Sequence, residues 1–352
     1  MPDSVKILVV DDSAYMRVIL RDMLESEEGL TVVDTAKDGI EALEKVERLR
    51  PDIVLLDIQM PRMDGLTTLQ MIMKNRPTRV VMLSAMDKLD GQLPLRALSQ
   101  GAVDFIPKPS GTISIDIINY KARIANHLRT IARAKLEALK MESITARLLT
   151  SGSEKTPDVR AKTKAIVLAA STGGPRALET VFSILPKNLP ASMFIVQHLP
   201  IEFSTLFAKR LDSVQGPSVR LAVDGVFVEN DTTYLAPGGT HLILEPKERK
   251  GVMMKLDDGP PVQFVRPSAN ILFETAARCY GQKLLGIVLT GMGSDGAKGA
   301  EVIKRYGGRV IVQNEESSVI FGMANAVMRA GAADEVLPLD DIPRRMIDFI
   351  EE

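Results

Sequence analysis

Short apolar runs alternate with amphipathic helical patterns over the first third of the chain. The runs KILVV, TVVDTA, DIVLLD, RVVMLSA and DFIPK are separated by segments with apolar residues at helical spacing. Most of these strand-like runs are continuously apolar, which is typical of strands buried on both faces of a sheet. From Lys6 to Lys108 the pattern therefore predicts a flavodoxin-like α/β fold, with five parallel strands and helices on both faces.

The same rhythm returns later in the chain, after an interruption. A helix predicted from about Ile113 runs into HLRTIARAKLEALKMESITARLL, and a polar stretch with Gly, Ser and Pro follows. Strand-like runs then restart with KAIVLAAS, ASMFIVQH, LLGIVLTGMG and GRVIVQN. We therefore expect a first domain over residues 1–125, a helical and polar linker over 126–160, and a second domain over 161–352.

The second domain contains one segment with a different pattern. SVRLAVDGVFVENDTTYLAPGGTHLILEP is rich in β-branched residues and turn signals, which favours hairpins. The second domain is therefore predicted to be a doubly wound, mostly parallel α/β domain with an inserted β-hairpin region.

Composition and charge narrow the class of protein. The chain is 45% apolar and 25% charged, as in ordinary globular proteins, and 44 Lys and Arg residues nearly balance 45 Asp and Glu residues. This balance argues against nucleic acid as a partner. Cys279 is the single cysteine, no signal-peptide layout is visible, and no apolar run approaches the roughly 20 residues of a membrane span. We expect a cytoplasmic protein that does not insert into membranes.

Acidic residues gather at the predicted strand ends of the first domain. Asp11 and Asp12 follow the first strand and Asp57 ends the third, so their carboxylates should converge at one edge of the sheet. Close carboxylates repel one another, and Mg²⁺ is the expected counterion. Ser84 and Lys108 end the fourth and fifth strands and are placed to bind phosphoryl oxygens. The alternative, that each Asp only caps a helix or turn, explains a single position well and the set poorly.

These positions resemble the response-regulator receiver family. The pair DD, the stretch LLDIQMPRMDG, the SA after strand four and the PKP after strand five match its motifs in order. The resemblance implies that Asp57 accepts a phosphoryl group from a histidine kinase, and that Asp11 and Asp12 bind Mg²⁺ together with Asp57. It also implies a relay of the phosphorylation signal through Ser84, Phe105 and Lys108.

Three strand ends of the second domain carry Ser171, His198 and Asp295. Ser171 lies in AASTGGP, where a buried strand meets a helix whose first amides are suited to hold an oxyanion. Each residue has a simpler interpretation: a helix cap for Ser171, a polar interior residue for His198 and a turn residue for Asp295. Together they fit the nucleophile, base and orienting carboxylate of a serine hydrolase. The motif G-x-S-x-G is missing, which argues against an α/β-hydrolase.

The segments AASTGGP, VQHLP and LTGMGSDGA, behind a receiver domain, resemble the chemotaxis protein-glutamate methylesterase family. The resemblance implies hydrolysis of glutamate methyl esters, and deamidation of certain glutamines, on the cytoplasmic domains of chemoreceptors. It assigns Ser171 as the nucleophile, His198 as the general base and acid, and Asp295 as the orienting carboxylate. The backbone amide of Met292 and Thr172 are implied at the oxyanion. The resemblance also implies that hydrolysis requires no metal or organic cofactor.

Some questions stay open from sequence. Arg266, Ser268 and Asn270 either line a substrate groove or belong to a capped helix start. The sequence has two rival interpretations: a nucleotide-binding oxidoreductase, whose G-x-G-x-x-G motif is missing, and a phosphorylation-gated binding module without enzymatic activity. The order of the domains also suggests that phosphorylation of Asp57 relieves occlusion of the catalytic cleft by the receiver domain.

Overall fold

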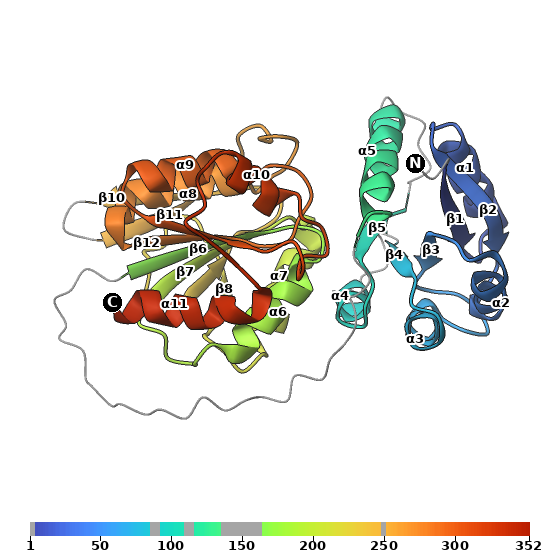
Figure 1. Ribbon diagram of the computed structural model, residues 1–352, viewed down its shortest axis with the longest axis horizontal. Helices are drawn as coiled ribbons and strands as arrows, with labels where there is room; N and C mark the ends of the chain where they lie inside the picture. The colour runs from blue at the N-terminus through green and yellow to red at the C-terminus, as the bar shows by residue number, and fades with distance from the viewer. Residues whose placement is uncertain (1–3, 85–91, 109–115, 135–163, 248–250) are drawn as a thin grey trace. The chain divides into compact units, whose positions relative to one another are not determined.

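The computed structural model describes residues 4–84, 92–108, 116–134, 164–247 and 251–352. The chain divides into two compact units, Met1–Met141 and Glu142–Glu352. Each unit is an α/β structure with its own sheet (Figure 1). Within the described residues, no helix combines the length and apolar character needed to cross a bilayer.

The first unit contains the predicted five-stranded parallel sheet. Its strand order is β2-β1-β3-β4-β5, and every neighbouring pair is parallel. The strands are β1 (Val5–Val10), β2 (Leu30–Ala36), β3 (Ile53–Asp57), β4 (Arg79–Ser84) and β5 (Asp104–Pro107). All of β3 is buried, as its continuous apolar sequence predicted.

Helices cover both faces of this sheet (Figure 1). They are α1 (Ala14–Glu25), α2 (Gly39–Leu49), α3 (Gly65–Asn75), α4 (Gln92–Ser99) and α5 (Asp116–Ile131). Helix α1 contacts α5, while α3 contacts both α2 and α4, so the two groups occupy opposite faces. The flavodoxin-like prediction is confirmed.

Helix α5 crosses the domain boundary expected at residue 125. Leu128 and Ile131 on its second half are fully buried, and the Arg79 guanidinium donates a 2.8 Å hydrogen bond to the carbonyl of Ala134. The first residues of the expected linker therefore pack as part of the first unit. The helix start expected at Ile113, the remaining linker (135–160) and the first three residues of the expected second domain (161–163) lie outside the described residues.

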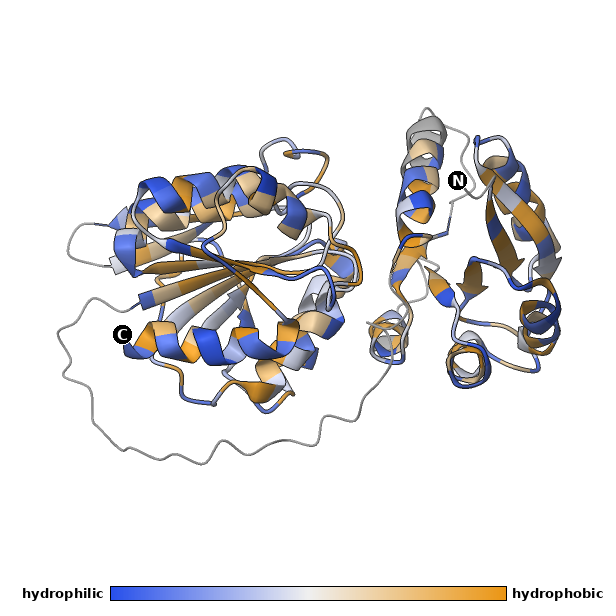
Figure 2. Cartoon of the chain, in the orientation of Figure 1, coloured by the Kyte–Doolittle hydropathy of each residue, from blue (hydrophilic) through white to orange (hydrophobic). Residues whose placement is uncertain are grey.

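The second unit is built on a seven-stranded sheet with the order β14-β13-β12-β6-β7-β9-β8. Its strands are β6 (Lys164–Ala170), β7 (Ala191–Gln197), β8 (Val219–Leu221), β9 (Thr233–Leu235), β12 (Leu284–Val288), β13 (Arg309–Gln313) and β14 (Glu335–Leu337). Every neighbouring pair of these strands is parallel. Hydrophobic colour concentrates on the strands and the inward helix faces (Figure 2).

The segment predicted to form hairpins divides between two roles. Its end, β10 (His241–Lys247), pairs in an antiparallel hairpin with β11 (Gly251–Asp257), which follows the segment. The earlier strands β8 and β9 instead extend the main sheet in parallel from β7. Their β-branched residues indicated strands correctly, but local composition does not determine the partner of a strand.

Six α-helices and two short 3₁₀ turns complete the described part of the second unit. They are α6 (Gly174–Ile184), α7 (Ile201–Asp212), α8 (Ala269–Tyr280), η2 (Gly281–Lys283), α9 (Ala297–Arg305), α10 (Met323–Arg329), η3 (Leu339–Asp341) and α11 (Ile342–Glu351). Phe182, Phe194, Phe207 and Phe273 are fully buried between helices and sheet. The core thus fixes strands β12, β6 and β7 side by side, and their carboxyl ends share one edge.

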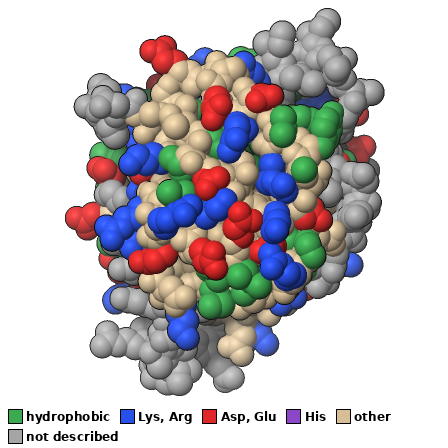
Figure 3. Space-filling view, turned by 90° about the vertical axis from the view of Figure 1, so that its right-hand side faces the viewer, with side chains coloured by type: hydrophobic (Ala, Val, Ile, Leu, Met, Phe, Trp, Pro, Cys, Tyr) green, Lys and Arg blue, Asp and Glu red, His purple; other side chains and the backbone are tan. Residues whose placement is uncertain are grey.

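Charges of both signs alternate on the face of the molecule over α1, β2 and α2 (Figure 3). Lys45 on α2 pairs with Asp34 and Glu41, and Arg48 pairs with Asp34. A continuous basic patch of the kind that binds phosphate backbones is not visible on this face.

Candidate functional site

Asp11, Asp12 and Asp57 meet at the carboxyl edge of the first unit's sheet. One carboxylate oxygen from each lies within 4.8 Å of the others. Asp11 and Asp57 are buried, at 0% and 4% exposure, while Asp12 is exposed. None of the adjoining helices α1 and α3 is capped by these carboxylates, because Ser13 caps α1 and Asp64 caps α3. These carboxylates therefore do not cap the two helices, but Asp11 Oδ1 accepts from the Ser13 amide at 3.0 Å and Asp57 accepts from the Gln59 amide, so both also cap the turns that follow them.

Lys108 lies inside this acidic pocket. Its Nζ is 2.7 Å from Asp11 Oδ2 and 2.9 Å from Asp57 Oδ2. Burial raises the pKa of Asp57; the Lys108 ammonium opposes this rise without cancelling it, and the Asp11 charge adds to it. Burial would lower the pKa of Lys108, but its two carboxylate partners raise it above the ordinary value. The pocket keeps an excess of negative charge next to a fixed cation.

Ser84 and Phe105 lie on the strands beside this pocket. Ser84 ends β4, one residue past Leu83, which is the register partner of Asp57. Its carbonyl accepts a 2.8 Å hydrogen bond from the Lys108 amide, so β4 and β5 are joined where the pocket begins. Phe105 is buried on β5 opposite Met82. Lys108 contacts the carboxylates directly, while Ser84 and Phe105 lie on the adjoining strands.

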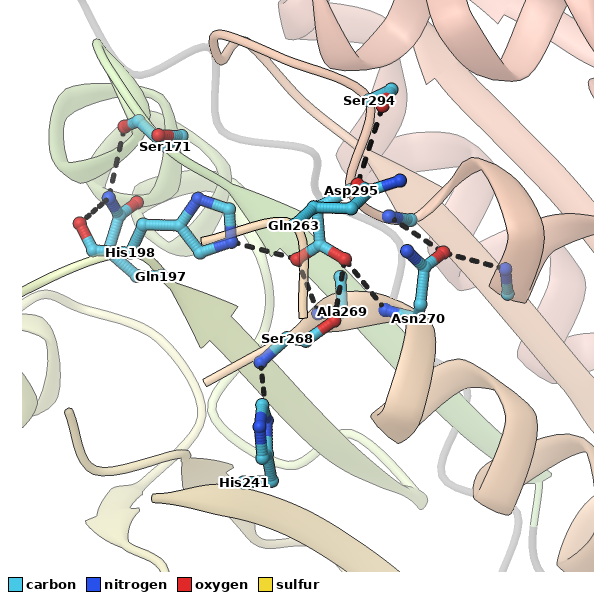
Figure 4. A network of polar contacts seen from close by, with 12 residues as sticks. Ser171, Gln197, His198, His241, Gln263, Ser268, Ala269, Asn270, Ser294 and Asp295 are labelled. Atoms are coloured by element: carbon cyan, nitrogen blue, oxygen red, sulfur yellow. Dashed lines mark hydrogen bonds and ion pairs between the residues drawn. The ribbon is translucent and has the colours of Figure 1, made fainter. Parts of the chain in front are cut away.

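Ser171, His198 and Asp295 come together at the carboxyl edge of the second sheet. Ala170 and Gln197 are register partners on β6 and β7, so the residues that follow them, Ser171 and His198, leave the sheet side by side. The amide of His198 donates to the Ala170 carbonyl at 3.1 Å. His198 Nε2 lies 2.9 Å from Asp295 Oδ2, and Figure 4 shows the imidazole between Ser171 and Asp295.

The imidazole of His198 uses Nε2 to contact its carboxylate partner. With Asp295 ionised, its oxygen accepts a hydrogen bond from this nitrogen, which leaves Nδ1 of the neutral imidazole as the nitrogen that carries the basic lone pair. In the common serine-protease arrangement these two nitrogens have the opposite roles. The described contacts include no hydrogen bond from the Ser171 hydroxyl to the imidazole, a bond that in many hydrolases tightens only when substrate is bound.

Asp295 is saturated with hydrogen-bond donors. Besides His198, its oxygens accept from the Ser268 hydroxyl at 2.7 Å and from the amides of Ala269 and Asn270 at 2.6 and 3.1 Å. These amides begin α8, so the carboxylate also faces the positive end of a helix. Burial would raise the pKa of Asp295, but the hydrogen bonds from His198, Ser268 and Ala269 lower it overall. Asp295 therefore stays ionised in a site where it is only 3% exposed.

Close backbone packing brings the Asp295 loop against Ser171. A side chain on Gly291 would meet Ser171 Cβ at 2.8 Å and its backbone nitrogen at 3.1 Å, so only glycine fits there. The next residue, Met292, is partly buried, and the described hydrogen bonds do not use its amide. Thr172 is buried, and its carbonyl accepts from the Thr290 hydroxyl. The two predicted oxyanion residues thus border Ser171 from two different loops.

Gln197 supports both reacting residues, a role that sequence reasoning missed. Its Nε2 donates to the carbonyls of Ser171 at 3.0 Å and His198 at 3.3 Å. The side chain is 2% exposed, and Gly174 leaves room for it, since a Cβ there would lie 2.0 Å from Gln197 Oε1. A polar residue inside the apolar strand ASMFIVQ was the available signal.

Thr290 and Gln313 form a second support that the sequence did not reveal. The Thr290 amide donates to Gln313 Oε1 at 2.8 Å, and the Thr290 hydroxyl donates to the Thr172 carbonyl at 3.0 Å and accepts from the Ile320 amide. Both side chains are buried. They join the loops that follow β6, β12 and β13, and so fix the backbone behind Ser171.

Ser268, Asn270 and Arg266 hold the loops around Asp295 in place. Ser268 is fully buried against Asp295, and Asn270 Oδ1 accepts from the amides of Gly296 and Gly299 at 3.1 and 2.8 Å. Arg266 is partly exposed, and its guanidinium donates to two backbone carbonyls, Asp258 and Gly259. These contacts favour the helix-start interpretation over a groove lining for Ser268 and Asn270. The cap of α8 is Asp295 itself, because Ser268 makes no side-chain cap.

His241 extends this network one step further from the triad. Its Nδ1 accepts from the Ser268 amide at 3.1 Å, and its Nε2 lies 3.2 Å from the Pro260 carbonyl (Figure 4). These partners assign the neutral tautomer with the proton on Nε2. His241 is 1% exposed, and it positions Ser268, which in turn donates to Asp295.

Comparison with known proteins matches each unit to a known family. Residues 166–346 match the family model described as CheB methylesterase, and residues 7–116 match the model of the response regulator receiver domain. The crystal structure of the Thermotoga maritima CheB methylesterase catalytic domain is similar, with a TM-score of 0.52 and 42% identity, over 53% of this chain and 99% of that chain.

Two full-length relatives carry one name. A Pyrococcus horikoshii protein named protein-glutamate methylesterase/protein-glutamine glutaminase is 42% identical over 351 residues, which cover 100% of this chain and 95% of the relative. A Thermotoga maritima protein of the same name is 40% identical over 346 residues, which cover 98% of each.

Proposed function

Because the chain belongs to the CheB methylesterase family and carries a response regulator receiver domain, we propose that it is a phosphorylation-activated esterase of chemotactic adaptation. Its substrates are glutamate methyl esters, and certain glutamines, on the cytoplasmic domains of chemoreceptors, which would place the enzyme in the cytoplasm. The observation that carries the proposal is the hydrogen bond between His198 and Asp295 beside Ser171.

The proposed reaction uses these side chains in turn. His198 Nδ1 removes the proton of the Ser171 hydroxyl, whose oxygen attacks the γ-carbonyl of the substrate. Asp295 stabilises the imidazolium that forms, and its lowered pKa keeps it negatively charged while it does so. The amide of Met292, assisted by Thr172, would donate to the oxyanion of the tetrahedral intermediate. The imidazolium then protonates the leaving methanol or ammonia, and water releases glutamate from the acyl-enzyme.

The receiver unit would control this reaction through Asp57. A kinase of the histidine class supplies the phosphoryl group, and Lys108 is placed to bind one of its oxygens. The carboxylates of Asp11, Asp12 and Asp57 suit Mg²⁺, because they offer three hard oxygen ligands in a pocket with excess negative charge. When bound, Mg²⁺ neutralises charge on the incoming phosphoryl group. Ser84 and Phe105, on the adjoining strands, would carry the change outward.

The proposal is tested by methanol release from a methylated receptor, with and without a small phosphodonor and Mg²⁺. Release is expected to need Ser171 and to rise with the phosphodonor only while Asp57 is present. Ser171→Ala should therefore abolish methanol release, and Asp57→Ala should abolish its increase with the phosphodonor. A folded protein that takes up phosphate and releases no methanol would instead support a phosphorylation-gated binding module.

The occlusion hypothesis has a separate test. A fragment from about Thr163 onward lacks the receiver and should be more active than the unphosphorylated full-length chain. Equal or lower activity of the fragment would contradict occlusion.

A further inference from the structure

The tip of a small hairpin beside the active site carries an unusually exposed aromatic residue. Phe264 is 95% exposed, the highest value among the large hydrophobic side chains that the structure describes. Single exposed apolar residues are common on protein surfaces and need no explanation by themselves. The backbone of this hairpin and its position, however, distinguish Phe264 from the others.

The hairpin holds Phe264 in a backbone conformation that favours other residues. Val262 and Val265 exchange two hydrogen bonds, of 3.1 and 3.0 Å, around a two-residue turn. Gln263 and Phe264 both have positive φ, at 51° and 67°. Such turns prefer Asn-Gly, because a bulky residue in the left-handed region brings its Cβ close to the backbone carbonyl. A turn that served only to reverse the chain would carry Asn or Gly at this position.

The hairpin is attached directly to the catalytic loops. The Ser294 hydroxyl, next to Asp295, contacts Gln263 Oε1 at 3.4 Å (Figure 4). Past the other end of the turn, Arg266 donates to the carbonyls of Asp258 and Gly259 and accepts from the amide of Gly239. The tip is therefore fixed relative to the His198–Asp295 pair.

A second exposed apolar side chain lies near the base of the hairpin. Ile201 begins α7, just after His198, and is 57% exposed. The Cβ position of Gly239 is 3.8 Å from Ile201 Cδ1, and the Gly239 amide bonds to Arg266. Ile201 and Phe264 are thus connected through Gly239 and Arg266. Each exposes apolar surface on a segment next to a reacting residue, Ile201 after His198 and the Phe264 turn against Ser294.

On the basis of the proposed function, we propose that Phe264 anchors the receptor protein beside the methylated glutamate, by packing on apolar side chains that flank this residue. The turn Val262–Val265 contains no charged residue, so its natural partner is apolar. Exposed aromatic side chains bury large areas with little loss of conformational entropy and often dominate protein recognition. Because the tip is outside the triad, it contacts the protein around the ester and leaves a small ester untouched.

The test replaces Phe264 by Asn, which adopts the left-handed turn readily and so preserves the hairpin. We expect kcat/KM for methylated receptor to fall roughly tenfold, mainly through a higher KM, while hydrolysis of a small aryl acetate is unchanged. Phe264→Tyr keeps an aromatic ring and should retain most of the wild-type kcat/KM for methylated receptor. Tyr306→Asn, which removes another exposed aromatic residue of the second unit, is the matched control and should change neither substrate.

Other results would overturn the anchor. Receptor kcat/KM within twofold of wild type would show that Phe264 does not contact the substrate, and an equal loss on both substrates would show that the site itself is distorted. Higher small-ester activity without phosphodonor would mean that Phe264 binds the receiver unit. If wild type hydrolyses the aryl acetate but releases no methanol from receptor, the proposed function fails and the anchor fails with it.

Discussion

Two buried aspartates at strand-end sites of the two parallel sheets have opposite electrostatics. Asp57 and Asp295 are 4% and 3% exposed, and burial favours a raised pKa in both. Yet the pKa of Asp57 is raised and that of Asp295 is lowered. The difference therefore comes from the neighbours of each carboxylate rather than from its depth.

The neighbours differ in kind. Asp295 receives hydrogen bonds from a hydroxyl, two helix amides and an imidazole. Asp57 accepts from one backbone amide, that of Gln59, and shares the Lys108 ammonium with Asp11. A carboxylate with all its acceptor sites occupied orients its partner and does not react. A carboxylate that remains short of donors and close to a like charge gains from binding a cation or a phosphoryl group. Under the proposed function, each site has the electrostatics its task requires.

The largest effect is expected for Asp295→Asn, which keeps the shape and removes the charge. The amide oxygen at the Oδ1 position can still accept from the Ser268 hydroxyl and the Asn270 amide. The NH₂ group at the Oδ2 position then faces His198 Nε2, forces the imidazole proton onto Nδ1, and leaves the Ala269 amide without its acceptor. The base would carry a proton where it needs a lone pair. We expect kcat for methanol release to fall about 10³- to 10⁴-fold.

The control for this substitution is Asp334→Asn. Asp334 lies in the same unit, where it pairs with Lys304 and accepts from the Val310 amide. It should leave kcat within about twofold, as expected for a change away from the reacting groups. A loss of less than tenfold for Asp295→Asn would show that this carboxylate does not set the tautomer.

The reactivity of Cys279 tests how burial changes the pKa of a group that lacks strong hydrogen-bond donors. Burial, with a smaller contribution from the Glu245 charge, raises the pKa of its thiol to about 11 from 9.0. At pH 8 its thiolate fraction should therefore be about 100-fold lower than that of an unburied thiol. Because Cys279 is the single cysteine, mass spectrometry after iodoacetamide treatment reports it alone. Alkylation of the native protein as fast as of the urea-unfolded chain would contradict the burial argument.

Sequence predicted the strand ends and the residues on them. Continuous apolar runs identify buried parallel strands, and the polar residue that ends such a run lies at the ligand edge of the sheet. This logic placed Asp57 with Asp11 and His198 with Asp295, contacts that the structure contains. It does not depend on which strands are neighbours, and so it was unaffected by the unexpected parallel pairing of β8 and β9.

The supporting contacts could not be predicted, because they depend on which loops meet. Ser268 precedes Asp295 by 27 positions and reaches it only because α8 begins beside the loop after β12. Thr290 binds Thr172 across 118 positions through one hydroxyl. No local period or turn signal encodes such contacts. A buried Gln in an otherwise apolar strand, as at Gln197, was the only visible sign of them.

Gln197→Glu tests whether the hydrogen bonds that Gln197 donates to the backbone of Ser171 and His198 are needed for catalysis. A carboxylate there loses the two hydrogen bonds to the carbonyls of Ser171 and His198 and repels both oxygens. We expect kcat to fall about 10- to 100-fold with little change in KM, because the residue positions groups and does not contact substrate. Gln215→Glu, an exposed change of the same charge, should have no effect. Equal kcat in both variants would remove Gln197 from the positioning network.

Asp57→Asn should produce the smallest effect. Whether it raises or lowers the free energy of unfolding tests the contrast between Asp57 and Asp295. Since the folded pKa of Asp57 is raised, the unfolded chain ionises first as pH rises, and this residue lowers stability above an ordinary pKa of 3.8. Asn removes that cost, so at pH 7 the free energy of unfolding should rise by about 1 kcal/mol, without Mg²⁺ or phosphodonor.

The gain from Asp57→Asn should disappear below pH 3.8, where the wild-type carboxyl is protonated in both states. Asp295→Asn should show the reverse: a folded pKa below 3.8 means that this carboxylate stabilises the protein at neutral pH, and that the contribution is lost as pH falls through the lowered value. Hydrogen exchange of the β3 and α8 amides reports the stability of the first and of the second unit separately in the same protein. Destabilisation of the β3 amides by Asp57→Asn at pH 7 would mean that the pair with Lys108 outweighs burial and the Asp11 charge, and the contrast between the two sites would then be one of degree.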